Sequence, residues 1–364
     1  MRRIVARGGK PSLIDVDAPV CTPGRVLVRT AFSTVSAGTE SSVITRSGVP
    51  GAIDAEYPGE PPYERPPIRH WMRDSPTPTP PLPGSFSLGY SLAGQVIEVG
   101  SDIDDISVGD MVACAGSQDA HHADVVSVSR TLTAPLPAGL DPQTAAFVTP
   151  GAVATEAIRR TDCRFGDSVV IFGLGLIGLM AAQVARVAGL TVIGLEPSPV
   201  RREAARGFGI NDVFDPGSPD VTDRLMELSG GVGVDSAVLT LVSESSEPVN
   251  QAWRLARRGG RVGGGGVFGM NLERGAVFDR TYVHAIAFGA GRYDPWYEEG
   301  NVDYPIQYAR WTENRTMAYF LQLLAEKKVQ VKGMAEAFSL EQVEEAYQRL
   351  DAQDRPFTVQ FRYT

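Results

Sequence analysis

The chain is poor in cysteine and histidine, the side chains that most often build disulfide frameworks and zinc sites. Its three cysteines, Cys21, Cys114 and Cys163, lie far apart among 364 residues, and no CxxC pair occurs. This scattered, odd-numbered set excludes a disulfide framework and a cysteine-rich zinc site, and it favours a reducing compartment. His121 and His122 are adjacent, and adjacent side chains of a strand point to opposite faces, so they are badly placed to share one ion.

The chain also contains fewer basic than acidic residues. The 34 Lys and Arg residues are outnumbered by 43 Asp and Glu residues, which gives a formal net charge of −9. Nucleic acids and anionic membranes are bound through clustered Lys and Arg, so we expect neither as a partner. Residues 1–7 lack the apolar core of a signal peptide, and we expect a cytoplasmic protein.

One uncharged run reaches the length of a membrane span, at residues 168–185. Gly173, Gly175 and Gly178 interrupt this run at the spacing G-x-G-x-x-G. A buried strand over 168–172, a tight turn and a helix over about 176–188 account for the run better than a transmembrane helix does.

Strand and helix signals alternate from about residue 149 onward. The pattern predicts strands at 168–172, 191–195, 212–214, 235–240, 260–264 and 285–288, and helices at 176–188, 199–208, 219–228 and 246–257. Such alternation predicts an α/β fold with a doubly wound parallel sheet. Residues 1–35 instead give short β-rich runs separated by turns, which indicates antiparallel strands. Helices near 313–327 and 339–350, the latter opening like a capping box, and a strand at 357–361 complete the prediction.

Proline is concentrated in one segment, since 11 of the 26 prolines fall within residues 50–83. Proline lacks a backbone donor and disfavours helix in the residue before it, so this segment is predicted to be extended. It is either a surface linker or a loop that covers a site or a partner subunit.

The glycine motif has the sequence context of a dinucleotide site. It follows a predicted strand and opens a predicted helix, whose first residues, Leu176 and Ile177, would offer free N–H groups to a pyrophosphate. Glu196 lies 18 residues beyond Gly178, where a carboxylate can accept hydrogen bonds from ribose hydroxyls and repel a 2′-phosphate. The site therefore favours NAD over NADP, although Arg201 and Arg202, which follow Glu196 closely in the sequence, could weaken that preference.

Further motifs resemble the medium-chain dehydrogenase/reductase superfamily, which contains the alcohol dehydrogenases. They are GSDI at 100–103, VGDMV at 108–112, PLP at 135–137, GDSVVIFGLG at 166–175 and GGRV at 259–262. SAGTE at 36–40, GYSLAG at 89–94 and the run from GRYDP at 291–295 to RWTE at 310–313 resemble the dehydrogenase half of bi-domain oxidoreductases and their stand-alone relatives. The resemblance implies a GroES-like, β-rich catalytic domain of residues 1–149 and 289–364 around a Rossmann NAD-binding domain of 150–288, with a homodimer or homotetramer as the assembly.

The resemblance also shows which metal ligands are missing. Zinc-dependent members place a Cys, a His and a Cys or Glu at positions that hold Ala37, Tyr90 and Thr149–Pro150 in this chain, and the four-cysteine structural zinc loop is absent. Zinc needs three such protein ligands and an open position. We therefore expect no metal.

Without zinc, side chains must handle the proton of an alcohol substrate. Thr39 matches the hydroxyl that relays this proton in zinc members, and Tyr90 could donate to a carbonyl or, with a lowered pKa, act as the base. Glu40 could orient Tyr90 or form a salt bridge. His122 is a possible base or a structural residue.

Three groups of residues are predicted to line the rest of the site. Arg292, Tyr293 and Asp294 suit recognition of a polyhydroxylated or carboxylated substrate, with a subunit contact as the alternative, and Thr149 is also expected near the substrate. Thr240, Gly265 and Gly266 are expected at the ends of strands beside the nicotinamide.

These features favour an NAD-dependent, zinc-independent dehydrogenase that acts on a secondary alcohol of a small polar molecule such as a sugar or cyclitol. Three alternatives stay open: a zinc-free NADPH-dependent enone or quinone reductase, a redox-neutral epimerase with tightly bound NAD, and a non-catalytic NAD-binding protein.

Overall fold

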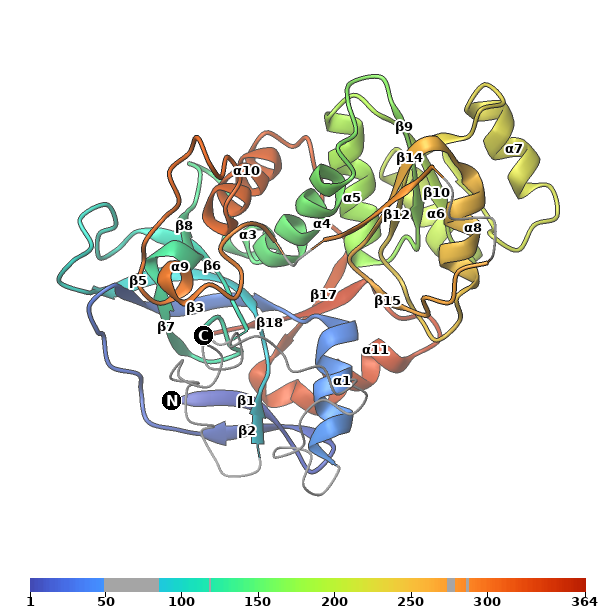
Figure 1. The fold of residues 1–364 in the computed structure, drawn as a ribbon. Helices are drawn as coiled ribbons and strands as arrows, with labels where there is room; N and C mark the ends of the chain where they lie inside the picture. Colours follow the sequence, from blue (N-terminus) through green and yellow to red (C-terminus); the bar gives the residue numbers. More distant parts are fainter. Residues whose placement is uncertain (49–84, 118, 274–278, 286–287) are drawn as a thin grey trace, which may run out of the picture. The chain divides into compact units, whose positions relative to one another are not determined.

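A computed structural model describes residues 1–48, 85–117, 119–273, 279–285 and 288–364 (Figure 1). The described chain divides into two compact units. Unit 1 contains residues 1–149, 290–321 and 332–364, and unit 2 contains residues 150–289 and 322–331. The proline-rich segment 50–83 lies outside the described residues.

Unit 2 is built on a six-stranded parallel sheet with the strand order β11-β10-β9-β12-β14-β16. Its strands are β9 (Ser168–Phe172), β10 (Thr191–Leu195), β11 (Asp212–Phe214), β12 (Val234–Leu239), β14 (Ala256–Gly264) and β16 (Thr281–His284). When the six strands are numbered by their order in the chain, they lie in the sheet in the order 3-2-1-4-5-6. The direction in which successive strands are added therefore reverses between β9 and β12. In open parallel sheets ligands bind at the carboxyl ends of the strands beside such a reversal.

Helices connect these strands. They are α4 (Val148–Arg160), α5 (Leu176–Val187), α6 (Pro199–Gly207), α7 (Val221–Leu228) and α8 (Glu247–Leu255), and a short parallel pair, β13 (Val242–Ser243) and β15 (Val267–Phe268), follows β12 and β14. All five residues of β9 are buried, as expected for a strand covered on both faces. Val170 and Phe172 pack with Trp253 of α8 in one cluster, and α5 packs on β9 and β10.

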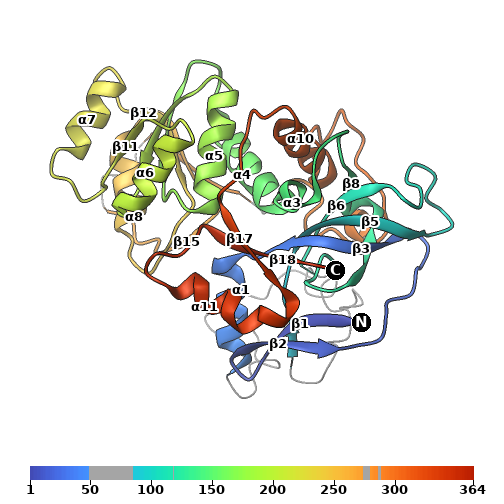
Figure 2. The same ribbon diagram turned by 180° about the vertical axis from the view of Figure 1, so that it is seen from behind.

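Unit 1 contains a seven-stranded, mainly antiparallel sheet with the order β17-β18-β3-β5-β6-β8, in which β7 also pairs with β3. Figure 2 shows β17, β18 and β3 side by side. A smaller sheet has the order β2-β1-β4. The strands are β1 (Arg2–Arg7), β2 (Lys10–Asp15), β3 (Arg25–Thr34), β4 (Ser85–Ser87), β5 (Ser91–Val99), β6 (Met111–Ala115), β7 (Val125–Ser129), β8 (Thr133–Pro135), β17 (Ala335–Ser339) and β18 (Thr358–Arg362).

The helical elements of unit 1 are mostly short. They are α1 (Ala37–Ser47), η1 (Arg130–Leu132), α3 (Pro142–Ala145), α9 (Pro295–Glu298), α10 (Glu313–Ala325, which continues into unit 2), η2 (Leu340–Gln342) and α11 (Val343–Asp351). The predicted capping box is confirmed: Ser339 and Gln342 exchange side-chain and backbone hydrogen bonds at the start of η2. Ile4, Val35, Phe338, Val343 and Phe361 belong to one buried cluster.

Two details differ from the sequence expectation. The strand predicted at 285–288 falls partly outside the described residues, which leave out 286–287, and its described ends, Ala285 and Phe288, are not in a strand. The strand that pairs with β14 is β16, because Arg261–Gly264 pairs with Thr281–His284 and the ladder ends with Ala285 N–H donating to Gly264 O at 2.9 Å. Residues 322–331 group with unit 2 rather than with the rest of 289–364, because the Gln183 amide exchanges two hydrogen bonds with the Gln330 backbone, at 3.0 and 2.8 Å.

The run at 168–185 is β9, a turn and α5, as predicted. Among the described residues no helix combines the length and hydropathy needed to cross a membrane.

Candidate active site

The glycine turn between β9 and α5 is shaped by close backbone contacts. Gly173 has a φ of +84°, which favours glycine. A Cβ at Gly178 would lie 1.8 Å from the Gly173 carbonyl oxygen, so only glycine lets α5 approach the turn this closely. A Cβ at Gly175 would meet only the Arg201 guanidinium, at 3.3 Å. The surface at Gly175, at the N-terminus of α5, therefore remains open to a bound group.

Glu196 follows β10 and is 6% exposed. One carboxylate oxygen accepts from Leu174 N–H at 2.9 Å, and the other accepts from Ser198 N–H at 3.0 Å. The hydrogen bond from Leu174 N–H to the carboxylate thus stabilises the glycine turn. Each oxygen has a second lone pair, which keeps ribose recognition open.

The two arginines behind Glu196 have different surroundings. The Arg202 guanidinium donates to the carbonyls of Glu196 and Pro197, both at 2.7 Å, and pairs with Asp215 at 3.2 Å. The Arg201 guanidinium instead lies beside Gly175. Arg201 is therefore the arginine whose guanidinium lies beside the glycine turn.

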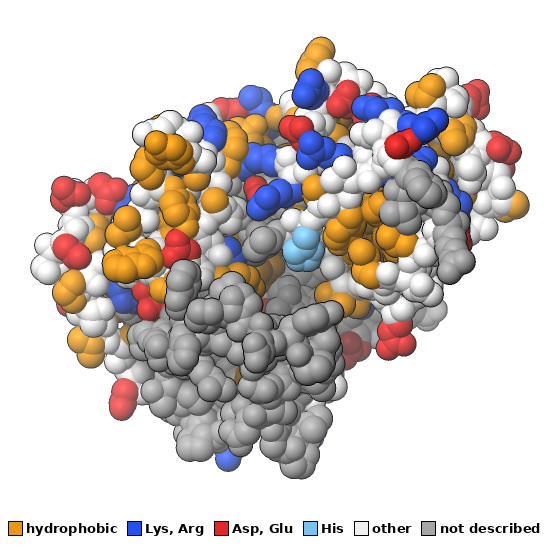
Figure 3. Space-filling model, in the orientation of Figure 1, with side chains coloured by type: hydrophobic (Ala, Val, Ile, Leu, Met, Phe, Trp, Pro, Cys, Tyr) orange, Lys and Arg blue, Asp and Glu red, His pale blue; other side chains and the backbone are white. Residues whose placement is uncertain are grey.

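The ends of β12 and β14 complete this side of unit 2. The Thr240 hydroxyl donates to the carbonyls of Gly173 and Phe172 at 2.8 and 3.1 Å, so it closes the turn rather than pointing outward. A Cβ at Gly266 would lie 2.0 Å from Leu241 O, whereas one at Gly265 would meet only Ala285, at 3.8 Å. Val242 and Val267 are 74% and 72% exposed, and Figure 3 shows hydrophobic side chains gathered on the surface of unit 2. This apolar surface suits a flat ring.

In unit 1 the predicted residues Thr39 and Tyr90 both lie near Ser36. The Ser36 hydroxyl donates to the Thr39 hydroxyl at 3.0 Å, and the Tyr90 phenol is near enough to Ser36 for that hydroxyl to influence its pKa. Thr39 is exposed in the first turn of α1, and Ser36 and Tyr90 are half-buried. These three neighbouring hydroxyl groups, of Tyr90, Ser36 and Thr39, are called the hydroxyl chain.

Burial raises the pKa of the Tyr90 phenol above its ordinary value; the hydrogen bond with Ser36 opposes this shift, and the negative charge of Glu40 adds to it. A phenol with a raised pKa keeps its proton at neutral pH. Tyr90 is therefore a hydrogen-bond donor in this structure and not a free phenolate base.

Glu40 lies at the centre of a buried network of unit 1. Its carboxylate accepts from Ser36 N–H at 2.7 Å, from the Tyr347 phenol at 2.5 Å and from His122 Nε2 at 3.1 Å. Glu40 therefore contacts Ser36 and not Tyr90 directly.

His122 is 0% exposed, and its Nδ1 lies 2.7 Å from the Ser33 hydroxyl, which is 2.8 Å from the Tyr363 phenol. Its ring packs against Phe361, with centroids 5.2 Å apart. Because Ser33, His122 and Glu40 are all buried, this series presents no nucleophile at the surface and His122 has no open edge for a substrate.

The predicted role of Thr149 as a substrate contact is corrected. Thr149 is 0% exposed, its hydroxyl donates to Tyr90 O at 2.9 Å, and its N–H donates to the Ser91 hydroxyl at 3.1 Å. Thr149 therefore fixes the backbone that carries Tyr90.

The three polar residues after β16 are held by their own neighbours. Asp294 caps α9 and accepts from Trp296 N–H and the Tyr304 phenol. Arg292 pairs with Glu298 at 2.5 Å and lies over the ring of Tyr293, which is 54% exposed. Of the three, only Tyr293 has most of its side chain on the surface.

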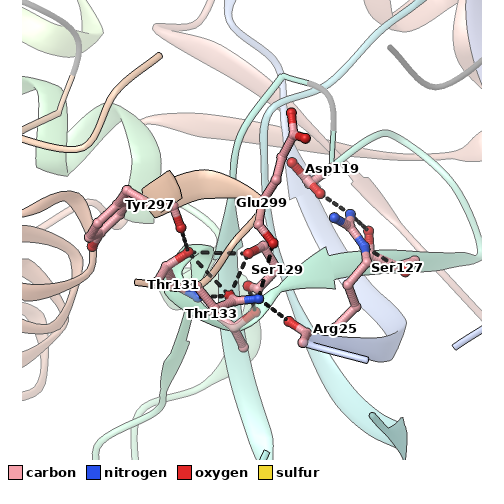
Figure 4. A network of polar contacts seen from close by, with 10 residues as sticks. Arg25, Asp119, Ser127, Ser129, Thr131, Thr133, Tyr297 and Glu299 are labelled. Atoms are coloured by element: carbon pink, nitrogen blue, oxygen red, sulfur yellow. Dashed lines mark hydrogen bonds and ion pairs between the residues drawn. The ribbon is translucent and has the colours of Figure 1, made fainter. Parts of the chain in front are cut away.

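A polar network fixes the segment around α9 (Figure 4). The Thr131 hydroxyl donates to Tyr297 O at 2.8 Å, and the Ser129 hydroxyl donates to Asn301 at 2.7 Å. Beside it, Arg25 of β3 donates to Ser127 O at 2.7 Å and pairs with Asp119. These contacts fasten α9 and Asn301 to η1 and to the end of β7.

The described residues at the expected ligand positions do not fit a catalytic zinc. The positions expected to carry its ligands hold the methyl group of Ala37, the phenol of Tyr90 and the engaged hydroxyl of Thr149. Within the described ranges, no three His, Cys, Asp or Glu side chains are grouped to hold a metal ion.

Sequence reasoning missed four members of the network: Ser33, Ser36, Tyr347 and Tyr363. Tyr347 and Tyr363 lie about 300 residues from their partners in the chain, where no local pattern could join them. Ser36 stands within the SAGTE motif beside Thr39, and that proximity was the one available signal.

Comparison with known proteins agrees with this architecture. The zinc-binding dehydrogenase family matches residues 177–293. D-guloside 3-dehydrogenase of Escherichia coli K12 is 28% identical over 326 residues, which cover 86% of this chain and 85% of the relative. Sorbitol dehydrogenase of Halalkalibacterium halodurans is 31% identical over 217 residues, or 52% of this chain and 63% of the relative. A solved chain from Sinorhizobium meliloti 1021 bound to NADP has a TM-score of 0.71 at 20% identity, covering 100% of this chain and 99% of that one.

The chain is thus similar to the zinc-binding dehydrogenase family over residues 177–293. The structural likeness confirms the predicted fold class, a Rossmann-type sheet with a GroES-like β-rich part. The chain is an oxidoreductase enzyme, as predicted.

Proposed function

We propose that this protein is a zinc-independent, NAD-dependent dehydrogenase that interconverts a secondary alcohol and a ketone on a sugar, polyol or cyclitol. Relatives named for D-guloside and sorbitol support a polyhydroxylated substrate. Unit 2 is assigned to the dinucleotide and unit 1 to the substrate. We also propose a cytoplasmic homodimer or homotetramer.

The observation that carries this proposal is the hydroxyl chain of Tyr90, Ser36 and Thr39. A phenol and two aliphatic hydroxyls stand in the part of unit 1 where related enzymes place metal ligands. Tyr90 keeps its proton and can donate a hydrogen bond to a carbonyl or alkoxide oxygen, which is the charge-stabilising role that zinc would otherwise have. Because the matched family is named for zinc, zinc independence is the part of the proposal that most needs a test.

The dinucleotide fits the glycine turn of unit 2. Gly175, the N–H groups of Leu176 and Ile177, and Arg201 would hold the pyrophosphate, and Glu196 would accept from ribose hydroxyls. When bound, the nicotinamide accepts or returns the hydride. Gly265 would leave space beside its ring, and Val242 and Val267 would offer an apolar surface.

One alternative has specific support. An NADPH-dependent reductase is favoured by Arg201 beside Gly175 and by the engagement of both Glu196 oxygens with backbone N–H groups. A solved chain of the same fold binds NADP.

Calorimetric titration of the purified protein with NADH and NADPH distinguishes the two. We expect NADH to bind at least about tenfold more tightly, a difference of about 1.4 kcal/mol. Oxidation of a D-guloside or of sorbitol with NAD would then establish the reaction. Tighter binding of NADPH, with reduction of an enone and no oxidation of either alcohol, would overturn the proposal in favour of the reductase.

A further inference from the structure

We propose that Tyr293 selects a cyclic sugar as substrate, by stacking its aromatic ring against the C–H face of a pyranoside. This inference rests on the proposed dehydrogenase function and narrows its substrate class from polyhydroxylated molecules to glycosides. It starts from the position of Tyr293, whose side chain is 54% exposed although both of its neighbours, Arg292 and Asp294, are engaged within unit 1.

The backbone of Tyr293 has a conformation that suits glycine better than tyrosine. Its φ is +64°, in the left-handed region. The turn that contains it is closed by Asp294 N–H, which donates to Gly291 O at 3.0 Å. Asp294 is fixed in turn, because its carboxylate accepts from Trp296 N–H at 3.0 Å. Side chains held on such a backbone are concentrated at active sites and ligand-binding sites, which favours a functional role for the Tyr293 ring.

The Tyr293 ring is supported on one face. The Arg292 guanidinium lies over this face, 4.1 Å from the ring centroid. The Arg292 side chain is only 12% exposed and pairs with Glu298 at 2.5 Å, so the support is itself held in place. The exposure of Tyr293 therefore belongs to the opposite face and the edge of the ring, where a ligand can stack.

A short series of contacts within unit 1 connects this ring with Tyr90. The Arg292 guanidinium donates to the Ser117 hydroxyl at 3.3 Å. The residue before Ser117 is Gly116, whose N–H donates to Tyr90 O at 3.1 Å. The stacking ring is thus linked, through one side chain and two adjacent residues, to the residue that is proposed to donate to the reacting oxygen.

A pyranoside suits such a ring better than an open-chain polyol does. A pyranose ring presents C–H groups on its face, and their partial positive charge is attracted to the negative face of an aromatic ring. An open-chain polyol has no fixed apolar face and loses more conformational freedom when it is ordered on a surface. The relative named D-guloside 3-dehydrogenase, which matches 86% of this chain, supports a glycoside as the substrate.

The test compares Tyr293→Asn with Tyr293→Phe, which retains the ring. Asparagine is chosen because it adopts a positive φ more readily than most residues, so the turn is kept. Tyr308→Asn is the matched control, because it makes the same change at a side chain that is 85% exposed. Oxidation of methyl D-guloside and of sorbitol with NAD, NADH affinity and thermal midpoint are measured for each protein.

We expect Y293N to lower kcat/KM for methyl D-guloside by about tenfold, the scale of one aromatic stacking contact, mainly through a higher KM. The kcat/KM for sorbitol and the NADH affinity should stay within about twofold of the wild type. Y293F should keep the wild-type preference between the two substrates, and Y308N should match the wild type. If Y293N does not fold, Tyr293→Gly accepts the positive φ without strain and should show the same selective loss.

Binding is measured separately from turnover. In saturation-transfer NMR with methyl D-guloside, we expect the ring protons of the sugar to receive saturation from the wild-type protein and from Y293F. This transfer should fall at least about twofold in Y293N and stay unchanged in Y308N.

An unchanged kcat/KM of Y293N for methyl D-guloside would overturn the assignment, and so would equal losses for both substrates. A Y293N protein that dissociates into smaller assemblies, with its substrate preference unchanged, would also overturn it and would assign Tyr293 to a subunit contact. A wild-type protein that binds NADH but oxidises neither substrate would instead overturn the proposed function, and the NMR transfer would then decide separately whether Tyr293 binds the glycoside.

Discussion

The glycine turn of unit 2 and the hydroxyl chain of unit 1 are assembled in opposite ways. The turn is made by residues 173–178, and its shape follows from backbone contacts among neighbours in the chain. The network around the hydroxyl chain joins Ser33, Ser36, His122, Tyr347 and Tyr363 through hydrogen bonds that span up to 330 residues.

This contrast has a physical cause. A pyrophosphate needs free N–H groups and close backbone approach, and a six-residue glycine spacing supplies both. Control of a buried proton needs several polar groups that satisfy one another, because an unpaired polar group in the interior is costly. Such a network can only be completed by the tertiary fold. A single substitution in the turn should therefore abolish dinucleotide binding. A single substitution in the network should instead lower activity and stability only in part.

The largest effect is expected from Gly178→Ala. The new Cβ would lie 1.8 Å from Gly173 O, which must shift. We expect a stability loss of about 3 kcal/mol or more and loss of NADH binding. Gly207→Ala in α6 is the control, since a Cβ there meets nothing within 4 Å. Thermal unfolding and calorimetry compare the two, and a G178A protein with wild-type NADH affinity would contradict the account of the turn.

Tyr90→Phe removes only the phenol oxygen from the hydroxyl chain. We expect kcat for alcohol oxidation to fall by about 100-fold, the scale of a lost acid–base group, with NADH affinity unchanged. Tyr308→Phe removes the same atom from a side chain that is 85% exposed and should have no effect. Equal kcat values for both variants in steady-state assays would remove Tyr90 from the mechanism.

Glu40→Gln tests the centre of the buried network. Glutamine keeps one accepting oxygen, but its amide nitrogen cannot accept from the donors that contact the other carboxylate oxygen. We expect about 2 kcal/mol of lost stability and roughly tenfold lower kcat, because Ser36 is less well positioned. Urea unfolding measures the loss of stability, and initial rates measure the loss of kcat. Glu336→Gln is the exposed control, because the ion pair of Glu336 with Arg349 contributes little to stability. An equal loss of stability and kcat in this control would contradict the central role of Glu40.

Arg201→Ala and Arg202→Ala separate the two arginines behind Glu196. Arg201 lies beside Gly175, so its loss should weaken NADH binding by about tenfold, near the strength of one charged hydrogen bond. Arg202 is engaged by carbonyls and Asp215, so its loss should alter NADH binding less and thermal stability more. Calorimetry that gave the reverse order would show that the two roles are exchanged.

The smallest effect concerns pH. Burial, and next the negative charge of Glu298, raise the pKa of Glu313 well above its ordinary value, against the opposing charge of Arg292. A carboxyl with a raised pKa in the folded state favours folding at low pH, and this contribution is lost as the pH rises from the ordinary pKa toward the raised one. Glu313→Gln stays neutral, so it should unfold about 1–3 °C higher than the wild type at pH 8 and show a smaller difference at pH 5. Scanning calorimetry at both values that found no pH dependence in the difference would contradict the assignment.

The same contrast explains what the sequence could predict. The strands β9 to β11 and the glycine turn follow from local periodicity and were predicted closely. The sequence did not predict β16 at Thr281–His284, because pairing with β14 and not local periodicity decides its position. Thr39, Tyr90, Glu40 and His122 were selected through family resemblance, and hydrogen bonds through Ser36 join Thr39, Glu40 and His122 in one network. Tyr347 and Tyr363 had no local signal, since only the fold brings them to Glu40 and Ser33.

The most direct test of the central claim, that hydroxyl groups and not a metal manage the substrate proton, is to measure kcat and metal content before and after chelation. We predict far less than one zinc per chain and the same rate of NAD-dependent alcohol oxidation after treatment with a strong chelator. One zinc per chain, with activity lost on chelation and recovered when zinc is added back, would contradict the account.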